Sequence, residues 1–212
     1  MLRFMENHDE ERIANNAFAG NPWLAIPGMI VTATLNTGPI MLYSGQEVGE
    51  PANGSQGFSV NGNTSIFDYC SIPEHQKWFN NGNCDGGQLS EDQKNLRNFY
   101  VKLLNAVLSK EALQNGEFYE LMLANEYQPG FDTKLYIYLR YTADQRILII
   151  TNFSRNQRQF NIKLPGDLLQ KLNISGRIEF TDLLNDSKYS TNDISQGVNV
   201  FLPATSGLLL EF

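Results

Sequence analysis

Three residues near the start of the chain, Asn7, His8 and Asp9, have side chains suited to chemistry on a polar substrate. They follow directly on a short apolar run, Leu2–Met5, so the sequence predicts a strand that ends abruptly in polar groups. A carboxylate such as Asp9 can serve as acid, base, ligand or charge stabiliser, and the imidazole of His8 can donate a hydrogen bond or bind a metal. The structural alternative is that Asp9 caps a following helix while His8 is an ordinary loop residue.

The elements around this motif alternate between helix and strand. Asn21 followed by Pro22 predicts a helix start, with the helix running toward Leu35 and interrupted at Pro27-Gly28. Ile40–Tyr43 is a short apolar run of the kind expected for a buried parallel strand. Strands that end in chemistry-bearing residues and are followed by helices are typical of a (β/α)8 barrel, whose functional groups lie at the carboxyl ends of its strands.

The clearest helical pattern of the sequence follows Ser90 and Gln93, which fit a capping box. An apolar stripe recurs after them at helical spacing, at Leu96, Phe99, Tyr100, Leu103, Leu104, Val107 and Leu108. This helix must therefore cover an apolar partner.

From about Leu113 the hydrophobic period changes from helix to strand. Strands are predicted at Phe118–Leu123, Leu135–Tyr141, Ile147–Asn152, Phe160–Leu164, Arg177–Asp182, Val198–Leu202 and Gly207–Phe212, with turn residues between them. Short strands at this spacing predict an antiparallel β-sandwich. We therefore expect two domains, residues 1–112 as an α/β barrel portion and residues 113–212 as the sandwich.

The amino-acid composition limits the kinds of partner that the chain can be expected to bind. The 212 residues carry a net charge of −7 and no basic run, which argues against nucleic acid as a partner. Only 18% of residues are charged, a composition typical of secreted, cell-surface or periplasmic proteins that handle neutral ligands. No apolar run approaches the roughly 20 residues of a membrane span. His75 stands apart from other ligand types, so no metal site and no cofactor are expected.

The segment from Phe4 to Arg12 resembles the fourth short motif of the α-amylase family of glycoside hydrolases. Further along, Gly38–Glu47 resembles the last barrel strand of that family, with its proline one place earlier than usual. The segments Ser65–Tyr69 and Leu202–Phe212 resemble the region after that strand and the closing strands of the C-terminal sandwich domain. The resemblance covers nearly the whole chain in the right order, as the C-terminal part of such an enzyme.

This resemblance implies a role for each residue of the motif. In the family, the aspartate of Asn-His-Asp stabilises the transition state and engages sugar hydroxyls, and the histidine beside it binds the same sugar. By match, Asp9 is the catalytic candidate, and His8, Asn7 and Arg12 are the substrate-binding candidates. Arg12 has two further interpretations, neutralising a nearby carboxylate or pairing structurally. The implied ligand is an α-glucan such as starch or a maltooligosaccharide.

The family's nucleophile and acid/base lie in motifs that are not found in this sequence. Retaining hydrolysis needs two carboxyl groups about 5–5.5 Å apart across the scissile bond, so we expect the isolated chain to be inactive. Glu6 and Glu47 are nearby carboxylates, for which loop anchoring is the simpler interpretation.

Aromatic residues are a weaker indication. Trp78 and Phe79, expected in a loop, are candidates for stacking on sugar rings, as are Trp23, Tyr69 and Phe58, although packing is the ordinary role of each. Cys70 and Cys84 are either a disulfide or two thiols.

Other hypotheses remain for the chain as a whole. One is a non-catalytic carbohydrate-binding or scaffold module that works through its sandwich, for which Tyr136, Tyr138 and Tyr141 are candidate residues. Another is a parent protein that has lost catalysis and serves as a partner subunit. An exposed barrel remnant would also allow two chains to dimerise.

Overall fold

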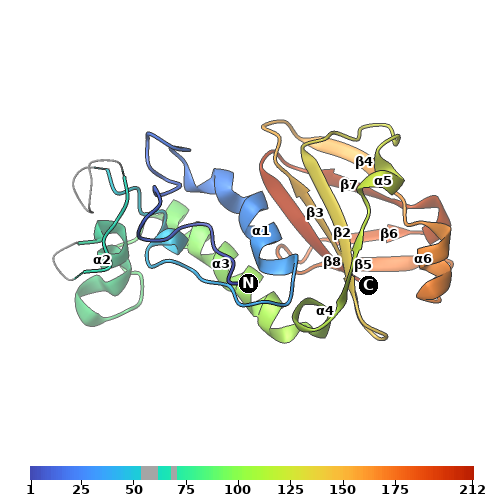
Figure 1. Ribbon diagram of the computed structural model, residues 1–212, viewed down its shortest axis with the longest axis horizontal. Helices are drawn as coiled ribbons and strands as arrows, with labels where there is room; N and C mark the ends of the chain where they lie inside the picture. The colour runs from blue at the N-terminus through green and yellow to red at the C-terminus, as the bar shows by residue number, and fades with distance from the viewer. Residues whose placement is uncertain (54–61, 68–70) are drawn as a thin grey trace. The chain divides into compact units, whose positions relative to one another are not determined.

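The computed structural model describes residues 1–53, 62–67 and 71–212, which form two compact units (Figure 1). Unit 1 comprises Met1–Thr32 and Gly38–Lys102, and unit 2 comprises Ala33–Thr37 and Leu103–Phe212. The division falls within two helices, α1 (Ile26–Thr34) and α3 (Glu91–Ser109). The expectations for Phe58, Tyr69 and Cys70 lie outside the described residues, whereas Cys84 is described and is an exposed free cysteine.

Unit 1 contains a short parallel pairing between its first residues and the segment after Gly38. The amide of Arg3 donates to the carbonyl of Pro39 (3.0 Å), and the amide of Met41 donates to the carbonyl of Arg3 (2.9 Å). Arg3 and Ile40 thus form one parallel bridge, where full strands at Leu2–Met5 and Ile40–Tyr43 were expected. Within the described part of unit 1 no further strand flanks this pair, and parallel pairing is seldom extensive without such neighbours.

The helical entry after Asn21 has two pieces, but they meet before Ile26, so the interruption predicted at Pro27-Gly28 is wrong. The Asn21 side chain accepts the amide of Trp23 and starts the 3-10 helix η1 (Pro22–Ala25). The helix α1 follows at once. Pro27 causes no break inside α1, because it lies in the first turn, where its missing N–H has no helical partner to lose.

The longest helix, α3, begins with the predicted capping box. The Ser90 amide donates to the Gln93 side chain (3.0 Å), and the Gln93 amide donates to the Ser90 hydroxyl (3.2 Å). Leu96, Tyr100 and Leu103 are buried as expected. Leu108 is 73% exposed, so its expected place in the stripe is wrong. Ala106, three residues after Leu103, is buried instead, and Leu108 lies off that face.

The remaining helices of unit 1 are short. They are the 3-10 helix η2 (Gln46–Val48), α2 (Pro73–Phe79) and the 3-10 helix η3 (Asn80–Gly82). Trp78 and Phe79 belong to α2, so the expectation that they lie in a loop is wrong. Pro73 at the first position of α2 presets the helical φ angle, which outweighs the loop-like composition around it.

Unit 2 is built mainly from antiparallel strands (Figure 1). The strands are β1 (Glu117–Glu120), β2 (Leu135–Tyr141), β3 (Arg146–Asn152), β4 (Arg158–Ile162), β5 (Ile178–Asp182), β6 (Lys188–Thr191), β7 (Val198–Leu202) and β8 (Ser206–Glu211). Within 103–212, all of which is described, six strands form a sheet in the order β1-β2-β3-β8-β5-β6, and β4 pairs with β7. Every one of these pairings is antiparallel.

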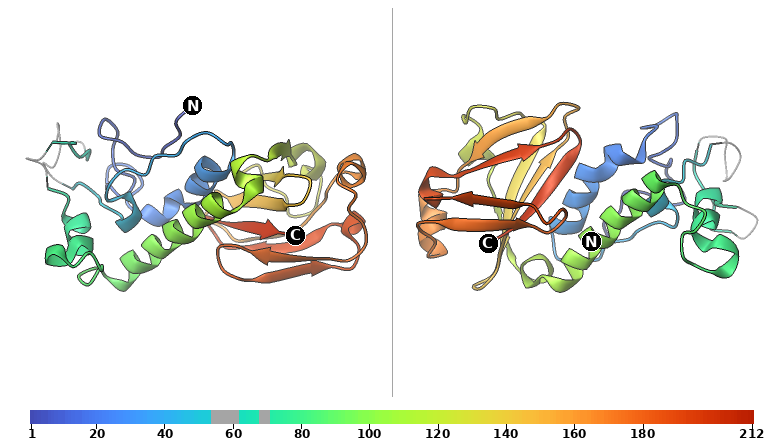
Figure 2. Two further views of the ribbon diagram at one scale, coloured as in Figure 1. Left: turned by 90° about the horizontal axis from the view of Figure 1, so that it is seen from below. Right: turned by 180° about the vertical axis from the view of Figure 1, so that it is seen from behind.

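One core joins the two sheets of unit 2. It takes alternate residues of β2 (Leu135, Ile137, Leu139) and of β3 (Leu148, Ile150), together with residues of β4 and β7 such as Phe160 and Val200. Alternation along a strand points these side chains to a single face, so the six-stranded sheet packs that face against β4 and β7. Figure 2 shows these strands, yellow to red, from two further sides with α6 (Gly166–Lys171, orange) at one end of them.

The second face of the six-stranded sheet is also covered. Ile147 and Ile149 of β3 have no exposed surface, and α4 (Glu111–Gln114) packs on β2 and β3. The hydroxyls of Tyr138 and Thr34 are hydrogen-bonded at 2.6 Å, and Arg140 donates to the carbonyl of Gly116 at 2.7 Å. Burial on both faces explains why β2 and β3 are almost continuously apolar.

The sequence missed five elements of unit 2. These are β6, α4, α5 (Met122–Asn125), α6 and the 3-10 helix η4 (Ile194–Gln196). Exposed and half-buried residues alternate along β6, and none of its four residues is fully buried. The reason is that β6 is an edge strand, which among the described strands pairs only with β5. A strand whose side chains are mostly in water has no apolar period to detect.

Asp182 closes the junction between β5 and β8, which pair through only two residues. Its Oδ1 accepts the amides of Leu184 (3.2 Å) and Leu209 (3.1 Å), and its Oδ2 accepts the side-chain amide of Asn185 (2.9 Å). The carboxyl is fully buried, and burial raises its pKa above the usual value of 3.8.

Asp182→Ala should lower the free energy of unfolding by about 2–4 kcal/mol, because two buried amides lose their acceptor. Asp182→Asn should cost less, since its carbonyl can still accept both amides. A raised pKa means that the folded chain binds this proton more tightly than the unfolded chain does. Stability of the parent should therefore fall as the pH rises through the window above 3.8, and Asp182→Asn should lack that component.

Urea unfolding across pH would measure both effects, with Asp144→Asn, a change at an exposed carboxylate, as the control. Equal stabilities for Asp182→Ala and the parent would contradict this role of Asp182.

Candidate functional site

The Asn7 side chain forms the turn that presents the polar motif. Its Oδ1 accepts the amide of Asp9 at 2.8 Å and the amide of Glu10 at 2.9 Å. This is an Asx-type turn, in which a short polar side chain replaces a backbone acceptor. The chain therefore leaves the bridged segment sharply, with His8 and Asp9 at the start of the loop. The Asn7 side chain thus shapes that loop, and its expected contact with substrate stays a prediction.

His8 and Asp9 are both accessible. The side chains are 39% and 71% exposed, and His8 Nε2 lies 3.4 Å from Asp9 Oδ2. The carbonyl of His8 accepts the side-chain amide of Asn63 at 3.3 Å, which ties the loop to the segment 62–64. An exposed pair of this kind contributes little to stability.

A surface hollow of about 530 Å³ lies beside Asp9. Its lining is part apolar and part polar, and is formed by Phe4, Met5, Asp9, Glu10, Glu11, Phe18 and Asn63. The volume is within the range of about 300–1,000 Å³ that small-molecule ligands occupy. His8 is not among the residues that line it.

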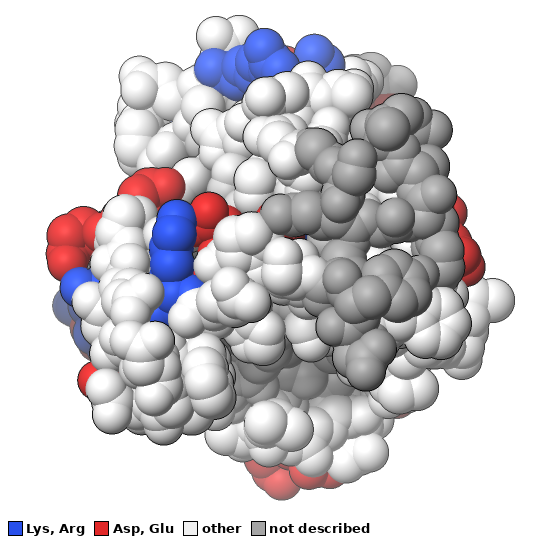
Figure 3. All heavy atoms as spheres, turned by 90° about the vertical axis from the view of Figure 1, so that its left-hand side faces the viewer, with Lys and Arg blue, Asp and Glu red and all other residues white. Residues whose placement is uncertain are grey.

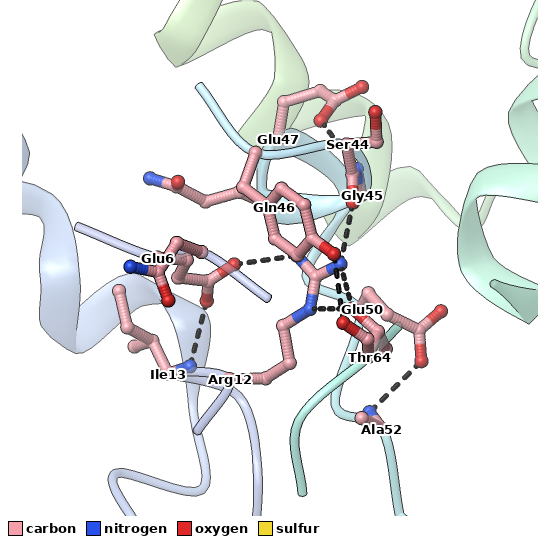
Figure 4. A network of polar contacts seen from close by, with 12 residues as sticks. Glu6, Arg12, Ile13, Ser44, Gly45, Gln46, Glu47, Glu50, Ala52 and Thr64 are labelled. Carbon is pink, nitrogen blue, oxygen red and sulfur yellow. Dashed lines mark hydrogen bonds and ion pairs between the residues drawn. The ribbon is translucent and has the colours of Figure 1, made fainter. Parts of the chain in front are cut away.

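Arg12 lies behind this loop at the centre of a buried polar network (Figure 4). It has no exposed surface, and its Nη1 donates to Glu6 Oε2 at 2.8 Å. Its Nη2 donates to the carbonyl of Ser44 at 2.7 Å and to Thr64 Oγ1 at 2.6 Å. Glu6 Oε1 accepts the amide of Ile13 at 2.7 Å. One guanidinium thereby links three segments that are distant in sequence.

Two further contacts hold the same residues. The guanidinium carbon of Arg12 lies 4.2 Å from the centre of the Tyr43 ring, a cation–π contact. The Tyr43 hydroxyl donates to the carbonyl of Thr64 at 2.8 Å, and the Arg12 amide donates to the carbonyl of Gly62 at 2.9 Å. Because Arg12 is enclosed by protein, it positions the loop in this structure and does not face the hollow. The expected contact of Arg12 with substrate has no accessible surface to support it.

The other carboxylates near the motif are anchors. Glu6 is 2% exposed, and burial raises its pKa, an effect that the Arg12 charge opposes. Glu47 Oε2 accepts the amide of Gly45 at 3.1 Å. Glu50, which no sequence pattern singled out, is buried and accepts the amides of Ala52 (3.0 Å) and Glu74 (2.9 Å).

The aromatic candidates for stacking on a sugar differ in exposure and in their protein partners. Trp23 donates its indole N–H to Asp92 at 2.9 Å, and thus has a protein partner. Trp78 is stacked with His75 at 5.7 Å between ring centres, and Phe79 is 50% exposed. Of the sheet tyrosines, Tyr138 and Tyr141 are buried.

The described residues contain neither a cluster of metal-ligating side chains nor a helix suited to a membrane. No group of three or more His, Cys, Asp or Glu side chains in 1–53, 62–67 and 71–212 could hold a metal ion. Across the same ranges, no helix has both the length and the apolarity required to cross a bilayer.

Comparisons with known proteins define the fold. No protein-family model matches the sequence, and no curated protein matches it. Among solved structures, AmyP in complex with maltose matches 99% of this chain and 40% of its own, with 19% identity and a TM-score of 0.68. The α-amylase of Geobacillus thermoleovorans complexed with acarbose matches 100% of this chain and 38% of its own, with 18% identity and a TM-score of 0.62.

The Nostoc punctiforme debranching enzyme is similar over 100% of this chain and 35% of its own, with 16% identity and a TM-score of 0.60. The chain thus has the fold of the C-terminal region of amylases, with a mostly antiparallel sheet and few helices. It spans about two fifths of the length of the structures that it matches.

Arg12→Met should lower the free energy of unfolding of unit 1 by about 3–5 kcal/mol, because it leaves the Glu6 carboxylate buried without its cation. The double variant Arg12→Met with Glu6→Gln should recover much of this loss, since a neutral amide can still accept the Ile13 amide. Both tryptophans lie in unit 1, so their fluorescence during urea unfolding measures the effect.

Lys94→Met is the matched control, because Lys94 also lies in unit 1 and pairs with Glu91 at 2.8 Å while the two side chains are 42% and 85% exposed. A loss for Arg12→Met no larger than that for Lys94→Met would refute the role of the buried pair.

Proposed function

We propose that this chain is the C-terminal part of a retaining glycoside hydrolase that acts on α-glucans, and that Asp9 is its transition-state-stabilising carboxylate. The observation that carries the proposal is the position of Asp9, exposed beside a hollow and directly after the parallel pairing at Arg3. The fold of amylases solved with maltose and acarbose supports the substrate class.

The parallel pairing supports a barrel portion in residues 1–112. Adjacent parallel segments followed by helices are the repeating unit of a (β/α)8 barrel, and polar residues follow the carboxyl ends of both segments, at Asn7 and Ser44. The two-sheet core of unit 2 supports a β-sandwich domain over residues 113–212. The compact units divide after Lys102, within α3, and the first strand begins at Glu117, so the proposed boundary at residue 112 lies between these two points.

The Asp9 carboxylate can act on the reacting sugar by accepting hydrogen bonds from two hydroxyl groups of that sugar. Cleavage of a glycosidic bond passes through a transition state with positive charge on the sugar ring. A fixed carboxylate that holds ring hydroxyls interacts more strongly as this charge develops, so the stabilisation appears mainly in the transition state. His8, beside it, can donate or accept a further hydrogen bond. Asn7 and Arg12 position the loop that carries both residues.

The nucleophile and the proton donor must come from residues other than Asp9. Glu6, Glu47 and Glu50 are engaged with backbone amides or with Arg12. Glu10 and Glu11 line the hollow, but they belong to the same loop as Asp9. The reaction requires carboxyl groups on both sides of the scissile bond, and consecutive residues of one loop do not provide this.

The sheet-based binding module has less support. It requires exposed aromatic side chains on one face of the strands, and Tyr138 and Tyr141 are instead buried. The Tyr138 hydroxyl bonds with Thr34 and the Tyr141 hydroxyl with Glu117. The expected dimer is supported only by exposed apolar side chains of unit 1, among them Leu2 (47%), Phe4 (40%) and Phe18 (65%).

Maltotriose should bind in the hollow and shift the NMR signals of the His8 ring, and Asp9→Asn should weaken this binding about tenfold. Such a loss corresponds to about 1.4 kcal/mol, just below the range of about 1.5–3 kcal/mol for a hydrogen bond to a charged group, because the side-chain amide that replaces the carboxylate would still accept one hydrogen bond. The chain has only two histidines, so the His8 ring signals can be assigned by comparison with His8→Gln. Asp144→Asn removes an equal, exposed charge in unit 2 and should leave the affinity unchanged. A His8 ring that does not respond to millimolar maltotriose would overturn the proposal for the hollow.

The purified chain should release no reducing sugar from starch or maltooligosaccharides, because Asp9 alone supplies neither nucleophile nor proton donor. A reducing-end assay measures this directly, with Asp9→Asn carried in parallel to reveal contaminating activity. Release of sugar by the parent chain that Asp9→Asn abolishes would contradict the predicted inactivity.

A further inference from the structure

We infer that unit 1 has a second carbohydrate site, at the end of α2 and separate from the hollow beside Asp9. A pocket of about 270 Å³ lies there and is lined by Ser71, Ile72, His75, Gln76, Trp78 and Phe79. It shares no lining residue with the hollow beside Asp9. The choice of an α-glucan as its ligand rests on the proposed function.

The lining of the α2 pocket selects for a neutral ligand. None of its six described lining residues is an Asp, Glu, Lys or Arg. In the described part of the face shown in Figure 3, most side chains are likewise neither acidic nor basic. A phosphorylated or carboxylated ligand would find no charge partner in this lining, whereas a neutral ligand leaves no charge unpaired.

The aromatic side chains give the α2 pocket a surface that fits a sugar ring. A pyranose has faces of C–H groups that pack on aromatic rings and an edge of hydroxyls that needs hydrogen bonds. Phe79 is 50% exposed at the last position of α2. His75 and Gln76 supply donors and acceptors in the same lining, with a serine hydroxyl at Ser71.

Trp78 is held rigidly beside this surface. The His75 ring stacks on it with 5.7 Å between ring centres, and the guanidinium carbon of Arg97 lies 5.0 Å from its ring centre. Its carbonyl accepts the amide of Gly86 at 3.0 Å. A ring that is already fixed loses little conformational entropy when a ligand packs against it.

The loop after α2 is fixed as well. Asn80 ends α2 in the left-handed conformation, and its side-chain amide donates to Asp85 Oδ1 at 2.8 Å. Gly87 donates its amide to the same oxygen at 2.8 Å, and Gln88 donates to Asn80 Oδ1 at 2.9 Å. The pKa of Asp85 is lowered by the Asn80 and Gly87 hydrogen bonds. The amide of Cys84 donates to the carbonyl of Phe79 at 2.9 Å, so this ordered loop also holds the end of the helix.

Titration of the whole chain with maltoheptaose, followed by NMR of indole N–H and imidazole signals, tests the second site. The chain has two tryptophans and two histidines, and each site has its own histidine. The indole signal of Trp78 and the ring signals of His75 should shift. The indole signal of Trp23 should not, because its N–H is bonded to Asp92. Trp23→Phe assigns the two indole signals.

Phe79→Ala should weaken the response of Trp78 about tenfold, the scale of one lost aromatic contact. Phe153→Ala is the matched control, since Phe153 is 45% exposed and lies in unit 2. It should leave the affinity unchanged. A Trp78 signal that maltoheptaose does not move, or equal affinities for Phe79→Ala and the parent, would overturn the second site.

The two proposals fail separately in this experiment. If only the His8 ring responds, the α2 pocket is not a site and the proposal for Asp9 stands. If only Trp78 and His75 respond, the α2 pocket binds glucan and the proposal for the hollow fails. A response to maltoheptaose at both places supports both proposals, and Asp9→Asn should then weaken the response of His8 and not that of Trp78.

Discussion

The buried ion pair between Glu6 and Arg12 is the interaction on which the loops of unit 1 depend. Taking a carboxylate and a guanidinium out of water costs several kcal/mol for each ion, and the cost is recovered only when hydrogen bonds satisfy both groups. Here Arg12 reaches the carbonyl of Ser44 and the hydroxyl of Thr64, and Glu6 also accepts the amide of Ile13. An apolar pair of similar volume would fill the space but would not connect these segments. The pair therefore fixes where the loop after Glu6 begins and ends.

This constraint separates the acidic residues of unit 1 into two kinds. Glu6 and Glu50 are buried and bonded to backbone amides, so their charges are used to hold segments together. Asp9 is exposed and lines the hollow together with Glu10 and Glu11. Burial keeps Glu6 and Glu50 from contact with a ligand, and Asp9 is thereby the accessible carboxylate of the Asn-His-Asp motif. The same distinction explains why Arg12 acts through the loop rather than on a ligand.

Sequence patterns predicted those parts of the fold that neighbouring residues determine, such as buried strands with an apolar pattern and a helix start with a capping box. The bounds of β2 and β7 were predicted correctly, and the capping box at Ser90 and Gln93 is present. The turn at Asn7 and the buried partners of Arg12 could not be predicted, because both depend on residues brought close only by folding. Thr64, for example, lies 52 positions from Arg12 in sequence. The burial of Glu50 was not predicted, because the flanking sequence does not distinguish a buried loop carboxylate from an exposed one.

The two units differ in how their strands pair, and this difference bears on where the catalytic groups would lie. In unit 2 the antiparallel strands pair over six or seven residues, and their central members are buried on both faces. In unit 1 the parallel pairing is a single bridge, and parallel strands are stable chiefly when others flank them. Under the proposed function, those flanking strands would also carry the nucleophile and the proton donor. The proposal would thereby give the limited pairing at Arg3 and the need for a nucleophile and a proton donor from other residues one explanation, because a barrel supplies its sheet and its active site from the same strands.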